Sequence, residues 1–287
     1  MASYYHRLHK NIHSFLGCDS EYDDCRVAIF GAPFDGTSCY RPGSRFASAA
    51  MRNESYGIET YSPYVDRDLS DIAVYDGGDL ELPFGNTEAA LHQIEEYADG
   101  ILTDGKIPLM IGGEHLVTLA AVRAAYRHFP ELRIVHFDAH TDLREQYLGE
   151  CLSHATVLRR CHDLIGAGRI YQFGIRSGER EEFLFAEKHH FIRRFDLVGV
   201  ENLASVLGDM PVYFTIDLDV LDPSVFPGTG TPETGGVGFL ELMNAARTVL
   251  RTNVVALDIN ELSPVYDNSG SSTMLACKLL REVLVSI

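Results

Sequence analysis

Short apolar runs rich in β-branched and aromatic residues alternate with longer helical patterns along most of the 287 residues. Helices are expected, for example, from Thr87 to Gly105 and from Phe239 onward. Strands that are joined through helices need crossover connections, which favours a parallel sheet with helices on both faces. The sequence therefore predicts an α/β fold, a three-layer αβα sandwich around a mainly parallel central sheet of about eight strands. The expected strands lie near residues 26–31, 71–76, 107–112, 133–138, 169–174, 190–196, 212–217 and 254–259.

No Pro/Ser-rich linker, internal repeat or low-complexity stretch interrupts this alternation. Residues 1–287 are therefore expected to form a single α/β domain, which is within the size range of large one-piece α/β domains. Six scattered cysteines without a CxxC pair are expected to be reduced structural thiols.

The chain is strongly acidic, with 24 Lys and Arg residues against 41 Asp and Glu residues and a net charge of −17. This charge argues against nucleic acid or an anionic membrane as a partner, and it is compatible with a small cationic ligand. No segment resembles a secretion signal, and none approaches the roughly 18 continuous apolar residues of a membrane span. A cytoplasmic location is expected.

Three of the expected strands run into clusters of carboxylate and imidazole side chains. These clusters are GGEH at Gly112–His115, DAHTD at Asp138–Asp142 and DLD at Asp217–Asp219. Residues two apart in an extended segment point the same way, so the acidic and histidine residues of each cluster share a face. Ligands bind beyond the carboxyl ends of the strands in open α/β sheets, which places the three clusters in one crevice.

The side chains of these clusters indicate a site for two metal ions. Four aspartates and two histidines without cysteine suit manganese(II), with zinc, cobalt, nickel and iron as plausible substitutes. Two divalent ions roughly 3.5 to 4 Å apart can lower the pKa of a shared water toward about 7 and aim it at an electrophile. Hydrolysis is therefore the expected reaction class. Removal of the metal is expected to raise some aspartate pKa values and to lower stability.

The ordered set of motifs resembles the ureohydrolase family of arginases and agmatinases over nearly the whole chain. The resemblance is carried by GGEH, DAHTD and DLDVLDP, then by PGTGTPETGG at Pro227–Gly236 and DINELSP at Asp258–Pro264. It implies an arginase-like fold, a metal-dependent hydrolase and two manganese(II) ions per subunit. Bacterial agmatinases are the most similar members, on the evidence of RPGSRF at Arg41–Phe46, YSPYVDRDL at Tyr61–Leu69 and ELPFGN at Glu81–Asn86.

The same resemblance implies roles for individual residues. Asp142, besides binding metal, would accept a hydrogen bond from the attacking water and pass a proton toward the leaving amine. His154 matches the catalytic histidine, and Thr231 matches a threonine that lines the guanidinium pocket. Glu261 matches the glutamate that binds the guanidinium, and a carboxylate is the natural partner of that planar cation because it accepts two parallel hydrogen bonds. One manganese would be held by His115, Asp138, Asp142 and Asp217, and the other by Asp138, His140, Asp217 and Asp219.

The expected reaction is hydrolysis of agmatine to putrescine and urea. The loop from Leu143 to Cys151 carries Glu145 and Glu150 and lacks a donor set for a carboxylate, which favours a substrate with a cationic tail. Arg144 would hold a carboxylate if it pointed inward, so guanidinobutyrate and arginine stay open as substrates. The resemblance also implies a homo-oligomer, a trimer or a hexamer.

Two functions from other classes were weighed against hydrolysis of a guanidino group. A dinuclear phosphoesterase needs a positive clamp for phosphate, but the ligand-bearing segments are poor in Arg and Lys. A non-catalytic homologue would ordinarily have lost a ligand or the proton shuttle, and this sequence retains all of them. Both functions are disfavoured.

The remaining histidines and paired glycines are expected to have structural roles. His136 lies inside an expected strand and is interpreted as a core histidine with a hydrogen-bonded ring. The pairs Gly77-Gly78 and Gly112-Gly113 are expected to let backbone segments approach the end of the sheet closely. Five further histidines are expected at the surface: His6, His9, His13, His189 and His190.

Overall fold

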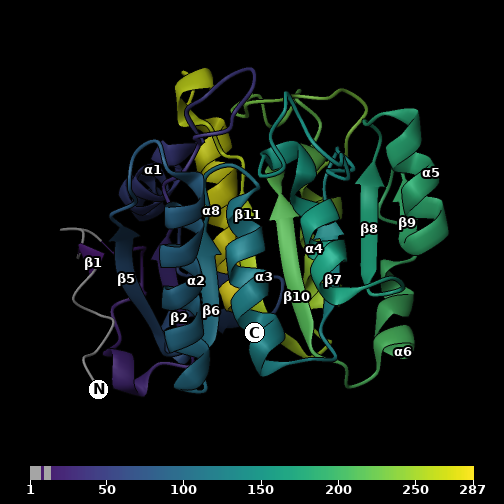
Figure 1. Ribbon diagram of the computed structural model, residues 1–287. Helices are drawn as coiled ribbons and strands as arrows, with labels where there is room; N and C mark the ends of the chain where they lie inside the picture. The colour runs from purple at the N-terminus through teal and green to yellow at the C-terminus, as the bar shows by residue number, and fades with distance from the viewer. Residues whose placement is uncertain (1–7, 10–13) are drawn as a thin grey trace.

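A nine-stranded sheet forms the centre of the molecule in the computed structural model, which describes residues 8–9 and 14–287 (Figure 1). Eight of these strands are parallel to their neighbours, and the short edge strand β1 is antiparallel to β5. The strand order is β1-β5-β2-β6-β11-β10-β7-β8-β9. The strands are β1 (Leu8–His9), β2 (Val27–Gly31), β5 (Val74–Leu80), β6 (Ile107–Ile111), β7 (Arg133–Phe137), β8 (Ile170–Ile175), β9 (Phe191–Arg194), β10 (Val212–Asp217) and β11 (Val254–Asn260).

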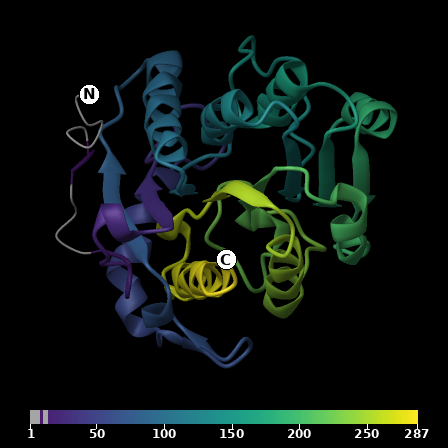
Figure 2. The same cartoon turned by 90° about the horizontal axis from the view of Figure 1, so that it is seen from below.

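Helices cover both faces of the sheet, as Figure 2 shows from below. Side chains alternate along each strand, so Val27 and Ile29 join one buried core, whereas Ala28 and Phe30 join the other. The first core includes α1 (Ala47–Glu54), α6 (Leu203–Leu207), α7 (Phe239–Val249) and α8 (Ser271–Leu284). The second includes α2 (Thr87–Thr103), α3 (Val117–His128), α4 (Val157–Ile165) and α5 (Arg180–His189). The predicted three-layer α/β fold is confirmed.

The local signals in the sequence place most elements correctly. Helix α2 starts where it was expected, because the side chain of Asn86 accepts a hydrogen bond from the backbone N–H of Ala89 at 3.0 Å. The strand expected near 71–76 instead begins at Val74 and continues through the two glycines to Leu80. Its pairing with β2 shifts register between Ile29 and Gly31, which local sequence patterns do not show. A separate two-stranded sheet pairs β3 (Tyr61–Ser62) with β4 (Arg67–Asp68).

Aromatic side chains pack beneath the carboxyl ends of the central strands. The ring of Phe137 meets those of Phe173 and Phe214 edge to face, with centroid distances of 5.9 and 5.0 Å. All three rings are fully buried. Each such burial stabilises the fold by about 1.5 to 3 kcal/mol. This packing holds the strand ends in place beneath the polar loops.

Four neighbouring strands carry the predicted functional segments to one edge of the sheet. β6, β11, β10 and β7 lie side by side and run parallel. Their carboxyl ends lie at the top of Figure 1. The chain then enters Gly112–His115 after β6, Asp138–Asp142 after β7 and Glu261 after β11, while Asp217 is the last residue of β10. Among the described residues, no helix is long and apolar enough to cross a membrane.

Candidate metal centre

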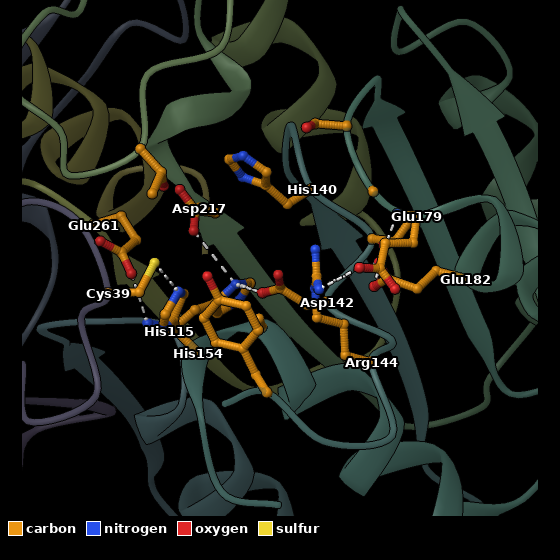
Figure 3. Close-up of a pocket in the computed structure, with 16 residues that line it drawn as sticks. Cys39, His115, His140, Asp142, Arg144, His154, Glu179, Glu182, Asp217 and Glu261 are labelled. Carbon is orange, nitrogen blue, oxygen red and sulfur yellow. Dashed lines mark hydrogen bonds and ion pairs between the residues drawn. The ribbon is translucent and has the colours of Figure 1, made fainter. Parts of the chain in front are cut away.

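The six predicted metal ligands come together beyond these strand ends, as Figure 3 shows for four of them. The side chains of His115, Asp138 and Asp219 are almost completely buried, and that of His140 is 25% exposed. Asp219 lies in a 3-10 turn at Leu218–Val220, and its backbone N–H donates to the side chain of Asp217 at 2.8 Å. The turn therefore holds the two acids of the DLD segment in a fixed relation.

One half of the cluster surrounds the ring of His115. The Nδ1 atom lies 3.1 Å from Asp138 Oδ2, 3.1 Å from Asp142 Oδ2 and 3.4 Å from Asp217 Oδ2. On the other side of the ring, Nε2 lies 2.9 Å from the hydroxyl oxygen of Thr215. An N–H at Nε2 that donates to Thr215 leaves the Nδ1 lone pair facing the three carboxylates. These four side chains match the first ligand set that the sequence predicted.

The other half of the cluster is built around His140. Its Nδ1 atom lies 2.9 Å from Asp219 Oδ2 and 3.4 Å from Asp138 Oδ1. Asp138 therefore turns one oxygen toward His115 and the other toward His140, which is the arrangement a bridging carboxylate requires. Asp217 directs Oδ2 toward His115, and its Oδ1 accepts the N–H of Asp219.

The electrostatics of the cluster fit a divalent cation. Burial raises the pKa of Asp217 well above its usual range, and the charges of Asp219 and Asp138 raise it further. Burial also raises the pKa of Asp138, but neighbouring histidines outweigh it and bring that pKa well below the usual range. Nearby carboxylates raise the pKa of both ligand histidines, His115 and His140, although burial opposes this. Positive charge is therefore favoured in this position, and four carboxylates with two imidazoles are suitable ligands for it.

Two side chains of the site stand on strained backbone. Asp142 and Glu261 have φ angles of 53° and 66°, the left-handed region that residues with a Cβ seldom adopt. Only three other non-glycine residues in the described part of the chain share this conformation. Such strain persists where the surrounding structure imposes it, and it is concentrated at functional sites.

Glu261 and His154 both line the pocket beside the cluster (Figure 3). Glu261 Oε1 accepts the backbone N–H of His115 at 3.0 Å, while the backbone N–H of Glu261 donates to Gly113 at 2.9 Å. Burial raises the pKa of Glu261 to about 8, although the charge of His154 opposes the shift. Burial lowers the pKa of His154, but hydrogen bonding and charge from Glu114 outweigh this and bring it to about 10.

Thr231 also lines the pocket, as the sequence predicted. Its hydroxyl donates to Asp219 Oδ2 at 3.3 Å. The paired glycines at Gly112-Gly113 have the close approach that was expected of them. A Cβ on Gly113 would lie 1.9 Å from the carbonyl oxygen of Phe34, and one on Gly112 would lie 1.8 Å from the side-chain oxygen of Asn260. Glycine is therefore required there for Glu114 and His115 to reach the site.

Comparison with known proteins identifies the family. A family model described as the arginase family matches residues 25–286. The chain belongs to the arginase family. An agmatinase of Bacillus subtilis is 46% identical over 275 residues, which cover 94% of this chain and 95% of that protein. A guanidinobutyrase of Pseudomonas aeruginosa is 32% identical over 283 residues, which cover 92% of this chain and 87% of that protein. The crystal structure of the agmatine ureohydrolase of Thermoplasma volcanium has a TM-score of 0.88 and 36% identity, with coverage of 96% of this chain and 94% of that one.

Membership of the arginase family confirms the resemblance seen in the sequence, including its closeness to bacterial agmatinases. The chain is an enzyme, a hydrolase that acts on a guanidino group, and its family is metal-dependent. The cluster described above is the potential metal-binding site of this arginase-family chain.

Residues without a predicted role also contact the site. The buried carboxylate of Glu114 accepts a hydrogen bond from the backbone N–H of Thr37 at 2.7 Å and lies 3.5 Å from His154 Nδ1. The thiol of Cys39 lies 3.3 Å from His154 Nε2. Cys39 and Thr37 precede His154 by more than 110 residues, so no local pattern could reveal the contact. Glu114 lies within the GGEH motif, but a role was predicted only for its neighbour His115.

The pocket continues outward from the cluster past Arg144, with a volume of about 250 Å³. Arg144 Nη1 donates to Glu179 Oε1 at 2.6 Å, and its Nε lies 3.7 Å from Glu182 Oε2. The guanidinium of Arg144 is therefore paired with two carboxylates. Neither Glu145 nor Glu150 is among the described residues that line the pocket, whereas Glu179 and Glu182 are. Glu150 lines an adjoining pocket that shares Cys39 and Tyr147 with this one.

Two of the remaining histidines have hydrogen-bond partners. His136 is fully buried and hydrogen-bonded, as predicted. His190, which was expected at the surface, is half-buried, and its Nε2 lies 3.1 Å from His162 Nδ1. Burial, together with neighbouring histidines, lowers the pKa of His190 to about 3. His6 and His13 lie outside the described residues.

Proposed function

We propose that this chain hydrolyses agmatine to putrescine and urea with two manganese(II) ions per subunit. One ion would be held by His115, Asp138, Asp142 and Asp217, and the other by Asp138, His140, Asp217 and Asp219. When bound, the two cations supply an activated water and stabilise negative charge that develops during attack. The donor set supports this assignment, because the only ligands are oxygen and imidazole nitrogen.

The observation that carries the choice of substrate is the pairing of Arg144 with Glu179 and Glu182. A free cationic donor in the tail pocket would favour a substrate carboxylate. Arg144 is already engaged by one carboxylate at 2.6 Å and by a second at 3.7 Å. Glu179 is 55% exposed on its side chain and lines the pocket, so it can meet a cationic tail. A guanidinium with a distal amine therefore fits better than a guanidino acid.

The residues around the reacting carbon support a division of roles. Glu261 is buried beside the cluster and would accept two hydrogen bonds from the planar guanidinium. Burial raises the pKa of Glu261, so a charged Glu261 without a partner is unfavourable in this pocket. A cationic substrate would supply the compensating positive charge. Thr231 would line the guanidinium pocket.

Two residues would handle protons. Asp142 would accept a hydrogen bond from the attacking water and carry a proton toward the leaving amine. His154 is held beside Glu114, which favours its protonated form, so it would donate a proton to the leaving amine.

The test is a urea-release assay on manganese-loaded protein with agmatine, arginine and 4-guanidinobutyrate side by side. We expect the largest kcat/KM for agmatine. Preference for guanidinobutyrate or arginine would overturn the tail assignment and leave the reaction class intact. No urea from any of the three would overturn the proposed activity. Light scattering on the same sample would test the trimer or hexamer that we also propose, which rests on the family resemblance.

A further inference from the structure

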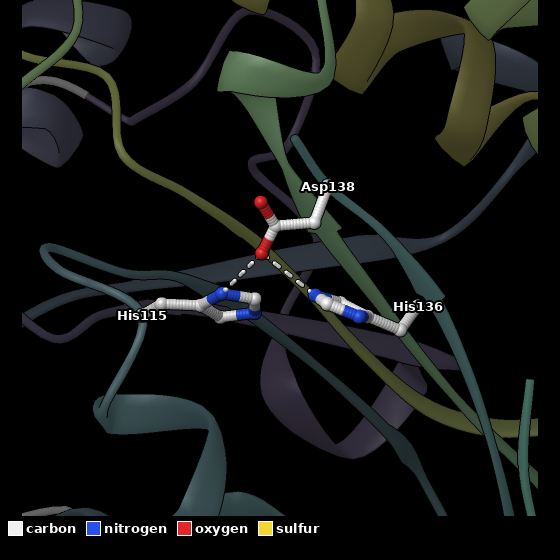
Figure 4. A group of neighbouring side chains, drawn as sticks. All are labelled: His115, His136 and Asp138. Carbon is white, nitrogen blue, oxygen red and sulfur yellow. Dashed lines mark hydrogen bonds and ion pairs between the residues drawn. The ribbon is translucent and has the colours of Figure 1, made fainter. Parts of the chain in front are cut away.

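His136 is a buried residue whose ring points at the carboxylate shared by the two halves of the cluster. It lies two residues before Asp138, and its Nε2 atom is 2.8 Å from Asp138 Oδ2 (Figure 4). The same oxygen lies 3.1 Å from His115 Nδ1. The donor atoms of His115, His136 and Asp138 are close enough together to share one ion. Geometry alone therefore leaves two roles open to His136, as a ligand or as a hydrogen-bond donor.

The hydrogen bonds of Gln172 decide between these roles. Gln172 lies opposite His136 on the neighbouring strand β8. Its Nε2 atom is 2.8 Å from the carbonyl oxygen of Thr141 and 3.1 Å from His136 Nδ1. A carbonyl oxygen only accepts, so the amide nitrogen of Gln172 must face it, and the second N–H of that amide points at His136 Nδ1. His136 Nδ1 therefore accepts, and a neutral His136 carries its proton on Nε2.

The far side of Gln172 supports the same orientation. Its Oε1 atom lies 3.4 Å from His190 Nδ1, and His190 Nε2 lies 3.1 Å from His162 Nδ1. Because Oε1 only accepts, His190 must donate from Nδ1, which leaves its Nε2 to accept from His162. A Gln172 amide turned the other way would set its oxygen against the carbonyl of Thr141. Each hydrogen bond from His162 through His190, Gln172 and His136 to Asp138 thus has one donor and one acceptor in the same order.

We propose that His136 is a positioning residue for the metal centre, with Gln172 fixing its Nε2–H as a donor to Asp138. This inference rests on the proposed function, because it assigns His136 a part in holding the bridging carboxylate. A hydrogen-bond donor in this position fixes the rotation of Asp138. One oxygen then faces His115 and the other faces His140. Hydrogen-bond partners of metal-binding carboxylates commonly have this role.

Two substitutions at His136 separate donation from simple packing. His136→Gln places an amide N–H near the position of Nε2, whereas His136→Leu removes the donor. His162→Gln changes the far end of the chain of hydrogen bonds and serves as the control. Calorimetric titration of metal-free protein with Mn²⁺ should show affinity about 10- to 100-fold weaker for His136→Leu. His136→Gln should restore most of that loss, and His162→Gln should match the wild type.

A measurement on the wild-type protein avoids any failure of a variant to fold. Nitrogen-15 NMR of labelled histidine, in metal-free and Zn²⁺-loaded protein, reports which ring nitrogen carries the proton. We expect His136 to have a protonated Nε2 and an unprotonated Nδ1 in both states. The His136→Gln spectrum identifies the signal by its loss.

The proposal is overturned if Nε2 of His136 is unprotonated and shifts on adding metal, which would make it a ligand. It is also overturned if His136→Leu binds Mn²⁺ as tightly as the wild type. Neither readout uses urea release, so an inactive enzyme with the expected affinities would support this inference while refuting the proposed substrate.

Discussion

Replacing Glu261 by glutamine should stabilise the metal-free protein and lower the activity of the manganese-loaded enzyme. Glu261 is 7% exposed, and its pKa is about 8 compared with an ordinary value of 4.5. At about 1.36 kcal/mol per pKa unit, ionising this side chain in the folded protein costs up to about 5 kcal/mol. Glutamine keeps the acceptor for the N–H of His115 and never ionises.

The sign and the pH window follow from the direction of the shift. A carboxyl whose pKa is higher in the folded state binds its proton more tightly there, so rising pH destabilises the folded wild type. The free-energy cost of ionising Glu261 in the folded protein is absent below pH 4.5 and complete above pH 8. The unfolding free energy of Glu261→Gln minus that of the wild type should therefore increase by about 2 kcal/mol from pH 6 to pH 8 and then level off.

The assay is equilibrium unfolding in urea at pH 6, 7, 8 and 9 with excess EDTA. Guanidinium chloride is unsuitable because its cation resembles the group that Glu261 is proposed to bind. The exposed Glu145→Gln variant controls for the loss of one negative charge. A difference that stays flat across this pH range would refute the buried-charge argument. In the manganese-loaded enzyme, the same Glu261→Gln change should lower kcat/KM for agmatine by about 100-fold, since a buried charged partner is lost.

Three further outcomes are expected. Chelation of divalent cations should lower the melting temperature, by the equivalent of about 2.7 kcal/mol when the metal had been present at 100 times its Kd; an unchanged melting curve would contradict the metal site. Asp217→Asn should abolish turnover and weaken Mn²⁺ binding at least about 10-fold in calorimetry, and an active variant would remove Asp217 from the ligand set. Gly113→Ala should lose about 1 to 3 kcal/mol of stability in urea unfolding, because its Cβ would meet the carbonyl oxygen of Phe34 at 1.9 Å. Gly238→Ala, where a Cβ meets no atom within 4 Å, is the control, and equal stabilities of the two variants would refute the steric argument.

The sequence predicted those features that depend on local pattern. Apolar runs ending in acids and histidines gave the strands and their order along the chain, and parallel strands bring such ends to one edge. The convergence of His115, Asp138, His140 and Asp219 follows from that rule. The start of helix α2 was likewise visible in its polar first turn.

Contacts between distant segments were not predictable in this way. Gln172 pairs with His136 because β8 lies beside β7, and nothing around residue 172 signals this. His190 was expected at the surface because the sequence shows no ligand partner for it, yet its ring reaches Gln172 on the neighbouring strand β8. Glu179 and Glu182 reach the pocket from the start of helix α5, and nothing in the sequence around these two acids signals this.

The ligands of the metal cluster stand at strand ends, whereas the tail pocket is lined by Tyr147, Glu179 and other residues of loops and helix starts. Chain segments outside regular elements tolerate replacement better than the strands that pack the core. Exchanging the segments around residues 144–151 and 177–182 between arginase-family members should therefore transfer preference for one guanidino compound to another enzyme. The recipient enzyme would keep its own metal ligands, which are proposed to act in breaking the carbon–nitrogen bond.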